Sequence, residues 1–145
     1  MLARRPSLQH AYEFISRHDD ALALPAGEDE REHALQVARD TGDYAPLLVD
    51  GKRPERFVLR PVDAIVARRL IDDHTAGRLG MNELLAWAFR AALDSVIGEF
   101  VVKHEEHERY GKVTTRAAID AFHDAVINEI GLHVWLRAVA MPPKS

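Results

Sequence analysis

The longest helical signal in the chain is the run NELLAWAFRAALDSVIGEFVVKHEEHERYG, residues 82–111. Asn82 is a favourable N-cap residue, and apolar side chains follow it at the spacing of one helix face: Leu85, Phe89, Leu93, Val96 and Phe100. Beyond Val102 the run is charged as far as Gly111. This pattern predicts one long helix with an apolar part in the core and a charged end in solvent. Such a helix favours a mainly helical fold for a chain of 145 residues.

Four further segments show helical spacing of apolar residues. They are residues 7–19 after the cap residue Ser7, residues 28–40 after an acidic first turn, residues 62–75, and residues 114–141. The third has the apolar stripe Val62, Ile65, Val66 and Leu70, and Gly77 is its expected stop. We therefore predict a mainly α fold, a helical bundle of about four to five helices with one small β-hairpin.

The predicted β-hairpin covers residues 46–60. Two short apolar runs flank the turn sequence DGKRPE, and Pro61 suits the first turn of the helix that follows. In a strand, Phe57 and Leu59 face one side, which we expect to pack on the helices. The other side carries residues that we expect to bind a partner: Arg56, Val58 and Arg60. The hairpin also leaves an unpaired edge that a partner strand can extend.

Length and composition indicate one globular domain, residues 1–145. Within it we expect peripheral N-terminal helices at 7–40, the hairpin at 46–60 and a helical core at 61–141. The chain has no cysteine, and its net charge of −4 argues against a generally basic nucleic-acid binder. We find no apolar signal sequence and no run long enough to span a membrane, so we expect a soluble cytoplasmic protein without membrane contact.

Histidine and glutamate residues raise the question of a metal site. In HEEHE, residues 104–108, a helix would bring two histidines and a glutamate to one face, and His123 could add a ligand. The run is not the H-E-x-x-H motif of zinc enzymes, so we expect a solvated face and keep a helical metal-binding protein as an alternative function. His133 lies on an apolar stripe, where we expect a buried, hydrogen-bonded histidine. Without a phosphate loop or nucleophile motif, we expect no catalytic residue, no cofactor and no metal.

Charge patterning offers a second alternative function, a nucleic-acid-binding regulator. The hairpin carries the basic cluster Lys52, Arg53, Arg56 and Arg60, although acidic neighbours oppose it. Residues 62–75 and 82 onward superficially form a helix-turn-helix, but the second helix begins with an acid and apolar bulk. Nucleic acid is therefore not the expected partner. Two i,i+4 pairs, Arg68 with Asp72 and Arg69 with Asp73, indicate a solvent-exposed helix face.

The C-terminal run LHVWLRAVAM, after Gly131, is apolar almost all round. A helix of this kind is either deeply buried or docked on a partner. Because tryptophan is favoured at interface hot spots, we expect a second partner-binding surface here. Its residues are Leu132, Trp135, Leu136 and Val139. The alternative is that all four close the protein's own core.

The sequence FVLRPV at residues 57–62, followed by an amphipathic helix, resembles a pattern in small tail-region proteins of tailed bacteriophages. These are tail assembly chaperones and virion-associated proteins, in which F-x-L-R-P-[LV] leads into a helix. The resemblance covers at most residues 47–100 and matches this chain at Phe57, Leu59, Arg60 and Pro61. It implies a non-enzymatic protein of the host cytoplasm or virion, which binds other protein subunits in a homo- or hetero-oligomer during tail or head–tail assembly. The His/Glu-rich run and the apolar C-terminal helix depart from the pattern.

Overall fold

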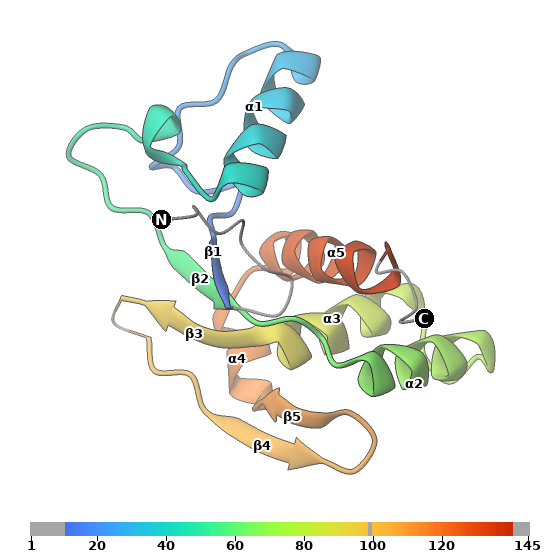
Figure 1. Cartoon of the computed structure of the whole chain (residues 1–145). Coiled ribbons are helices and arrows are strands. Elements are labelled where there is room, and N and C mark those ends of the chain that lie inside the picture. Colours follow the sequence, from blue (N-terminus) through green and yellow to red (C-terminus); the bar gives the residue numbers. More distant parts are fainter. Residues whose placement is uncertain (1–10, 99, 141–145) are drawn as a thin grey trace, which may run out of the picture.

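The computed structural model of the chain describes residues 11–98 and 100–140. Its elements in chain order are β1 (Tyr12–Phe14), α1 (Glu28–Thr41), the 3-10 turn η1 (Ala45–Leu47), β2 (Arg56–Leu59), α2 (Ala64–Thr75), α3 (Met81–Ala92), β3 (Leu93–Ile97), β4 (His104–His107), β5 (Gly111–Thr114), α4 (Arg116–Ala121) and α5 (Asp124–Ala140). The five helices and two antiparallel sheets of this part of the chain form a mixed α/β fold, so the predicted mainly α bundle with one hairpin is wrong. Figure 1 shows the three-stranded sheet between α1 at one end and the β4–β5 hairpin at the other.

The three-stranded sheet has the order β1-β2-β3, and β2 is its central strand. Phe57 and Leu59 are buried, as the alternation predicted. The predicted hairpin at 46–60 is wrong, because β2 pairs on both sides with strands far away in the sequence and has no free edge. The first half of that segment contains the turn η1, where Pro46 favours a turn over a strand. It is followed by a single β-bridge between Leu48 and Leu22.

The first predicted helix, residues 7–19, is also wrong where the structure describes it. Tyr12 and Phe14 belong to β1 and lie opposite Leu59 and Phe57. The expected cap Ser7 lies outside the described residues. Apolar residues at helical spacing do not decide between helix and strand in a segment this short, and the hydrogen bonds of β2 decide it here.

The predicted long helix at 82–111 ends at Ala92, and β3 follows without a loop. The register explains why the sequence resembles a helix. Phe57 pairs with Val96 and Leu59 pairs with Leu93, so one extra residue of β3 forms a bulge between these pairs. In a regular strand, side chains three residues apart point to opposite sides of the sheet. Because of the bulge, Leu93 and Val96 point to the same side, and both are buried. Their spacing therefore fits a helix face while their backbone is a strand.

The charged run predicted as the helix end forms the β4–β5 hairpin, in which Gly111 takes a positive φ of 68° at the turn. The region 61–141, predicted as a helical core, thus contains three strands as well. The last predicted helix is divided into α4 and α5 at Phe122, whose ring packs against Phe57, Phe89 and Phe100 in the main core.

Two predicted helices are confirmed by α1 and α2. The side chain of Asp63 caps α2 by accepting a hydrogen bond from the Ile65 N–H at 2.8 Å. After the last turn, Gly77 takes a positive φ of 79° and ends the helix. Pro61 precedes this helix instead of standing in its first turn. Ile65, expected in the apolar stripe, is 63% exposed, and Ala67 is buried instead. The helix α3 begins at Met81, and its N-cap residue is Gly80 instead of the expected Asn82.

The helices α3 and α5 pack closely against each other at Gly131. A Cβ atom at this position would lie 2.9 Å from the carbonyl carbon of Leu85 and closer still to its oxygen. Only glycine therefore fits without moving one helix. This contact, together with the sheet, encloses the main core, whose largest buried side chains include Phe89, Leu84 and Ile130.

A second, smaller core lies in the segment that we call the N-terminal lobe, residues 15–54. Its buried members come from α1 and the chain on both sides of it: Ile15, Leu22, Leu35, Ala38 and Tyr44. The lobe is joined in sequence to β1 and β2 only, which places it at the end of the sheet in Figure 1. Its position over α5 is held by side-chain contacts.

Candidate functional site

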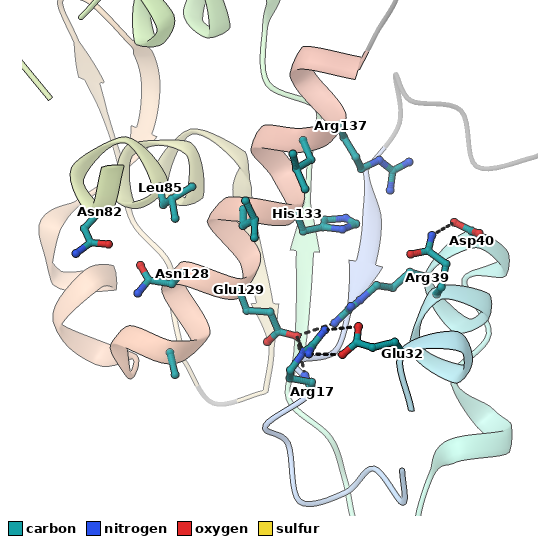
Figure 2. A pocket seen from close by; sticks show the side chains of 14 residues that line it. Arg17, Glu32, Arg39, Asp40, Asn82, Leu85, Asn128, Glu129, His133 and Arg137 are labelled. Atoms are coloured by element: carbon teal, nitrogen blue, oxygen red, sulfur yellow. Dashed lines mark hydrogen bonds and ion pairs between the residues drawn. The ribbon is translucent and has the colours of Figure 1, made fainter. Parts of the chain in front are cut away.

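A groove of about 760 Å³ lies between the N-terminal lobe and α5 (Figure 2). One wall is formed by three residues of α1, one turn apart, which we call the α1 wall: Glu32, Gln36 and Asp40. The other side is formed mainly by α5 and by Leu85 of α3. The residues that α5 supplies are Ala125, Asn128, Glu129, Leu132, His133, Leu136 and Arg137. The groove therefore combines the polar α1 wall with a side on which Leu85, Ala125, Leu132 and Leu136 lie among polar residues.

Glu129 links the two sides of the groove. Its side chain is 9% exposed, and it accepts hydrogen bonds from Ser16 Oγ at 2.6 Å, the backbone N–H of Arg17 at 2.9 Å and Arg39 at 2.6 Å. Arg17 in turn forms a two-point ion pair with Glu32. These contacts join α5 to the first residues of the lobe and to α1. Glu129 was not among the predicted site residues. Its place between the apolar residues Ile127 and Ile130 is a sequence signal for a buried carboxylate, and a buried carboxylate needs a charged or hydrogen-bonding partner.

His133 is half-buried beside the same groove and shares a hydrogen bond of 3.0 Å with the hydroxyl of Tyr12. Its ring also packs on Phe14, with the centroids 4.7 Å apart. The structure therefore agrees with the expected hydrogen-bonded histidine, although burial is incomplete. Burial lowers the pKa of His133 from 6.5 to about 4, and the positive charges of Arg137 and Arg39 act in the same direction.

This lowered pKa predicts a pH dependence of stability. Between pH 6.5 and about 4 the unfolded chain binds a proton that folded His133 excludes, so the stabilisation is complete above pH 6.5 and lost as the pH falls. We expect His133→Gln to make the fall in unfolding free energy shallower, by up to about 1.4 kcal/mol per pH unit. Urea unfolding from neutral pH to about pH 5 measures this, with His33→Gln on exposed α1 as the control. Identical slopes for wild type and His133→Gln would contradict it.

The apolar residues of α5 divide between core and surface. Leu132, Leu136 and Val139 are 46%, 53% and 45% exposed and follow one another along one side of the helix; we call them the α5 face. Trp135, predicted with them, is half-buried and packs against the main core. The structure thus brings three of the four predicted residues to the surface, two of them at the groove.

Comparison with protein-family models, curated proteins and solved structures found no match to this chain. No helix in the described parts of the chain is long and apolar enough to cross a bilayer. The groove and the α5 face therefore have to be interpreted from their own contacts, burial and charge.

The residues predicted to bind a partner on β2 are engaged within the domain. Arg56 forms an ion pair of 3.0 Å with Glu13 of the neighbouring strand, and Val58 is half-buried. Arg60 donates to the carbonyl oxygens of Ala91 at 3.2 Å and Lys112 at 2.8 Å. Arg60, a residue of the FVLRPV motif, therefore ties the sheet to α3 and β5.

Three residues of the predicted basic cluster have partners within the protein, and Arg53 is exposed. Lys52 lies 3.6 Å from Asp20 in an exposed ion pair, and Arg56 and Arg60 have the internal partners just described. Phosphate contacts need several cationic groups free on one surface. The contacts of these residues therefore do not favour the nucleic-acid alternative.

The geometry expected for a metal site is also absent. His104 and His107 are the two ends of strand β4 rather than neighbours on a helix face, and side chains three apart point to opposite sides of a regular strand. His104 is hydrogen-bonded to the carbonyl oxygen of Leu93 at 3.0 Å. Among residues 11–98 and 100–140, no group of three or more potential ligands is close enough to hold a metal ion.

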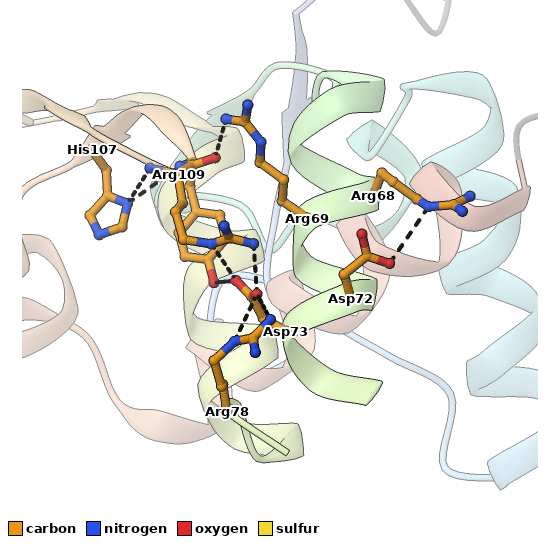
Figure 3. A network of polar contacts seen from close by, with 8 residues as sticks. Arg68, Arg69, Asp72, Asp73, Arg78, His107 and Arg109 are labelled. Atoms are coloured by element: carbon orange, nitrogen blue, oxygen red, sulfur yellow. Dashed lines mark hydrogen bonds and ion pairs between the residues drawn. The ribbon is translucent and has the colours of Figure 1, made fainter. Parts of the chain in front are cut away.

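A second polar network fixes the β4–β5 hairpin to α2 (Figure 3). Asp73 is 2% exposed and accepts from Arg109 at 2.7 and 2.8 Å, from Arg78 at 2.9 Å, and from the Tyr110 hydroxyl. The predicted pair between Arg69 and Asp73 is wrong, because Arg69 donates instead to the carbonyl oxygen of Arg109. The pair of Arg68 with Asp72 is present and exposed. Asp73 continues the buried side of α2 after Leu70, which is a sequence signal against a solvent-exposed pair with Arg69.

These arginine contacts also explain how the hairpin is held against the helices. Arg60, Arg69 and Arg90 each donate to a backbone carbonyl oxygen of the hairpin, at Lys112, Arg109 and Thr114. Arg90 further lies over the ring of Trp87, 4.2 Å from its centroid. We interpret this network as a structural attachment of the hairpin, since its charged groups are engaged with one another.

Proposed function

We propose that this chain is a non-enzymatic protein–protein interaction factor that binds another protein subunit through the α5 face. The observation that supports this is the row of half-exposed Leu132, Leu136 and Val139 beside a groove of about 760 Å³. Apolar side chains exposed next to one another at a concave surface are typical of binding sites. Helix-in-groove recognition uses such a row together with a polar rim.

The contacts of Glu129 support a binding role for the groove rather than a catalytic one. Its carboxylate already accepts from Ser16, Arg17 and Arg39, so its lone pairs are directed to the lobe and not to the open groove. His133 is paired with Tyr12 and its pKa lies near 4, which leaves it neutral near pH 7. These two groups thus position the walls of the groove.

The setting that we propose is assembly of a tailed bacteriophage particle, in the host cytoplasm or in the virion. The support for this setting is the FVLRPV resemblance at residues 57–62. In the fold, Phe57 and Leu59 are buried and Arg60 binds backbone carbonyl oxygens, so the matched residues stabilise the domain. The partner contact is then supplied by the α5 face, outside the part that resembles the phage proteins.

Co-expression tests the proposal. We expect a tagged chain to capture a tail or head–tail protein of a tailed bacteriophage, and Leu136→Lys to weaken the capture by about tenfold or more, because a charge is placed in an apolar contact. The matched control is Ile65→Lys, which changes an apolar residue that is 63% exposed on α2. Circular dichroism and thermal unfolding establish that each variant folds.

Two results would contradict this proposal separately. If Leu136→Lys captures the partner as well as wild type does, the α5 face is not the interface. If the tagged chain captures no virion component, the proposed setting is wrong.

A further inference from the structure

The negative charge of the protein is concentrated in the N-terminal lobe. Residues 15–54 contain nine acidic and five basic residues, whereas the rest of the chain contains fourteen of each. The lobe therefore accounts for the whole net charge of −4. A ligand at the groove lies between this negatively charged lobe and the apolar residues of α5.

The α1 wall faces the groove with acidic groups that extend along the helix. Glu32 and Asp40 lie four residues on either side of Gln36, so all three are on one side of α1. Glu32 is paired with Arg17, while Asp40 is exposed and has a hydrogen bond only from Gln36 among the described residues. Within the described residues, Asp40 is thus the carboxylate of the α1 wall that has no arginine partner.

The three arginines that line the groove are engaged inside the protein. Arg17 binds Glu32 and Glu129, and Arg39 binds Glu129 at 2.6 Å while its guanidinium lies over the ring of Phe14. Arg137 lies over the ring of Tyr12, 4.4 Å from its centroid. Their charges balance those of the acidic residues lining the groove, and the net negative charge of the lobe comes from acidic residues outside the lining.

We infer that the groove binds an amphipathic helix of another protein chain that has a basic side. The inference rests on the proposed function and specifies the chemistry of its partner. The apolar side of the bound helix would cover Leu85, Leu132 and Leu136, and its Lys and Arg residues would face the α1 wall. From Ala125 to Val139 the surface of α5 is about 20 Å long, which accommodates roughly four turns of a bound helix.

A synthetic peptide of about four turns, composed of Leu on one side and Lys on the other, is the probe. We expect it to bind the full chain in a fluorescence anisotropy titration, and a peptide with Glu in place of each Lys to bind at least about tenfold more weakly. A peptide of the same Leu and Lys residues in scrambled order controls for charge alone. Equal binding of the Lys and Glu peptides, or of the ordered and scrambled peptides, would overturn the inference.

Two variants locate the binding site. Asp40→Lys is expected to weaken binding of the Lys peptide by about fivefold, and Gln36→Glu is expected to strengthen it by about twofold. Glu106→Lys makes the same charge change as Asp40→Lys at an exposed position of β4, and it should change the affinity by less than about twofold. If Glu106→Lys weakens binding as much as Asp40→Lys does, the attraction is non-specific and the inference is wrong.

The same experiments distinguish the inference from the proposed function. If the Lys peptide does not bind, while Leu136→Lys still abolishes capture of a co-expressed subunit, the basic helix is the wrong partner and the α5 face remains the interface. If the Lys peptide binds and Leu136→Lys does not affect it, the bound helix lies elsewhere and the inference fails.

Discussion

Replacing Glu129 by glutamine is expected to lower the free energy of unfolding by about 3 kcal/mol. The carboxylate is 9% exposed and neutralises Arg39, whose side chain is 12% exposed. The variant keeps the volume of the side chain but leaves that guanidinium without an opposite charge. The NH₂ group of the new amide also faces hydrogen-bond donors from Ser16, Arg17 and Arg39. Urea unfolding measures the loss. Glu106→Gln, at an exposed position of β4, is the control and should stay within about 0.5 kcal/mol of wild type.

Hydrogen exchange shows where the Glu129→Gln variant is weakened. Because Glu129 joins α5 to Ser16, Arg17 and Arg39, we expect faster exchange in α1 while the amides of β2 remain protected. Uniform acceleration in both elements would mean that the lobe and the main core unfold together. An unfolding free energy equal to that of wild type would show that this buried ion pair contributes nothing net.

Replacing Asp73 by asparagine is expected to lower the midpoint of thermal unfolding on the order of 10 °C. The buried carboxylate of Asp73 binds Arg109, Arg78 and the Tyr110 hydroxyl, and these contacts attach the β4–β5 hairpin to α2. The neighbouring Asp72→Asn is a matched control, because Asp72 is exposed and pairs only with Arg68 at 3.6 Å. Equal shifts for the two variants would contradict the structural role of Asp73.

The same carboxylate makes stability sensitive to acid. Hydrogen bonds from Arg109 and then Tyr110 hold the pKa of Asp73 well below its ordinary value of 3.8. Its contribution is therefore complete above that value and is lost as the pH falls below it. In Asp73→Asn this part of the acid sensitivity should disappear, and differential scanning calorimetry from neutral to acidic pH can compare the two proteins.

The candidate site was only partly predictable from the sequence. The apolar run after Gly131 indicated a partner-binding helix, and Leu132, Leu136 and Val139 are exposed as a surface of that kind requires. The opposite wall of the groove could not be predicted, because it depends on how the N-terminal lobe lies over α5. Glu129 sets that position through Ser16, Arg17 and Arg39, which are 90 to 113 residues away in the sequence.

The predicted surface on β2 failed for a related reason. The alternation of Phe57 and Leu59 correctly gave the buried side of a strand, but it carried no information on the strand's neighbours. Both neighbours, β1 and β3, come from segments that were predicted as helices. The unpaired edge expected for a hairpin does not exist on a central strand.

The sequence by itself determined those elements whose signals are local. The acidic first turn of α1, the apolar stripe of α2 and the stop at Gly77 all act within a few residues, through the helix dipole, side-chain burial and backbone conformation. Only the tertiary structure decided the strands. Leu93 and Val96 are three apart and share a buried side because a bulge in β3 shifts the alternation against β2, and a bulge is defined by its partner strand. Hydrogen bonds between distant segments, not the local period of apolar residues, therefore made this chain a mixed α/β protein.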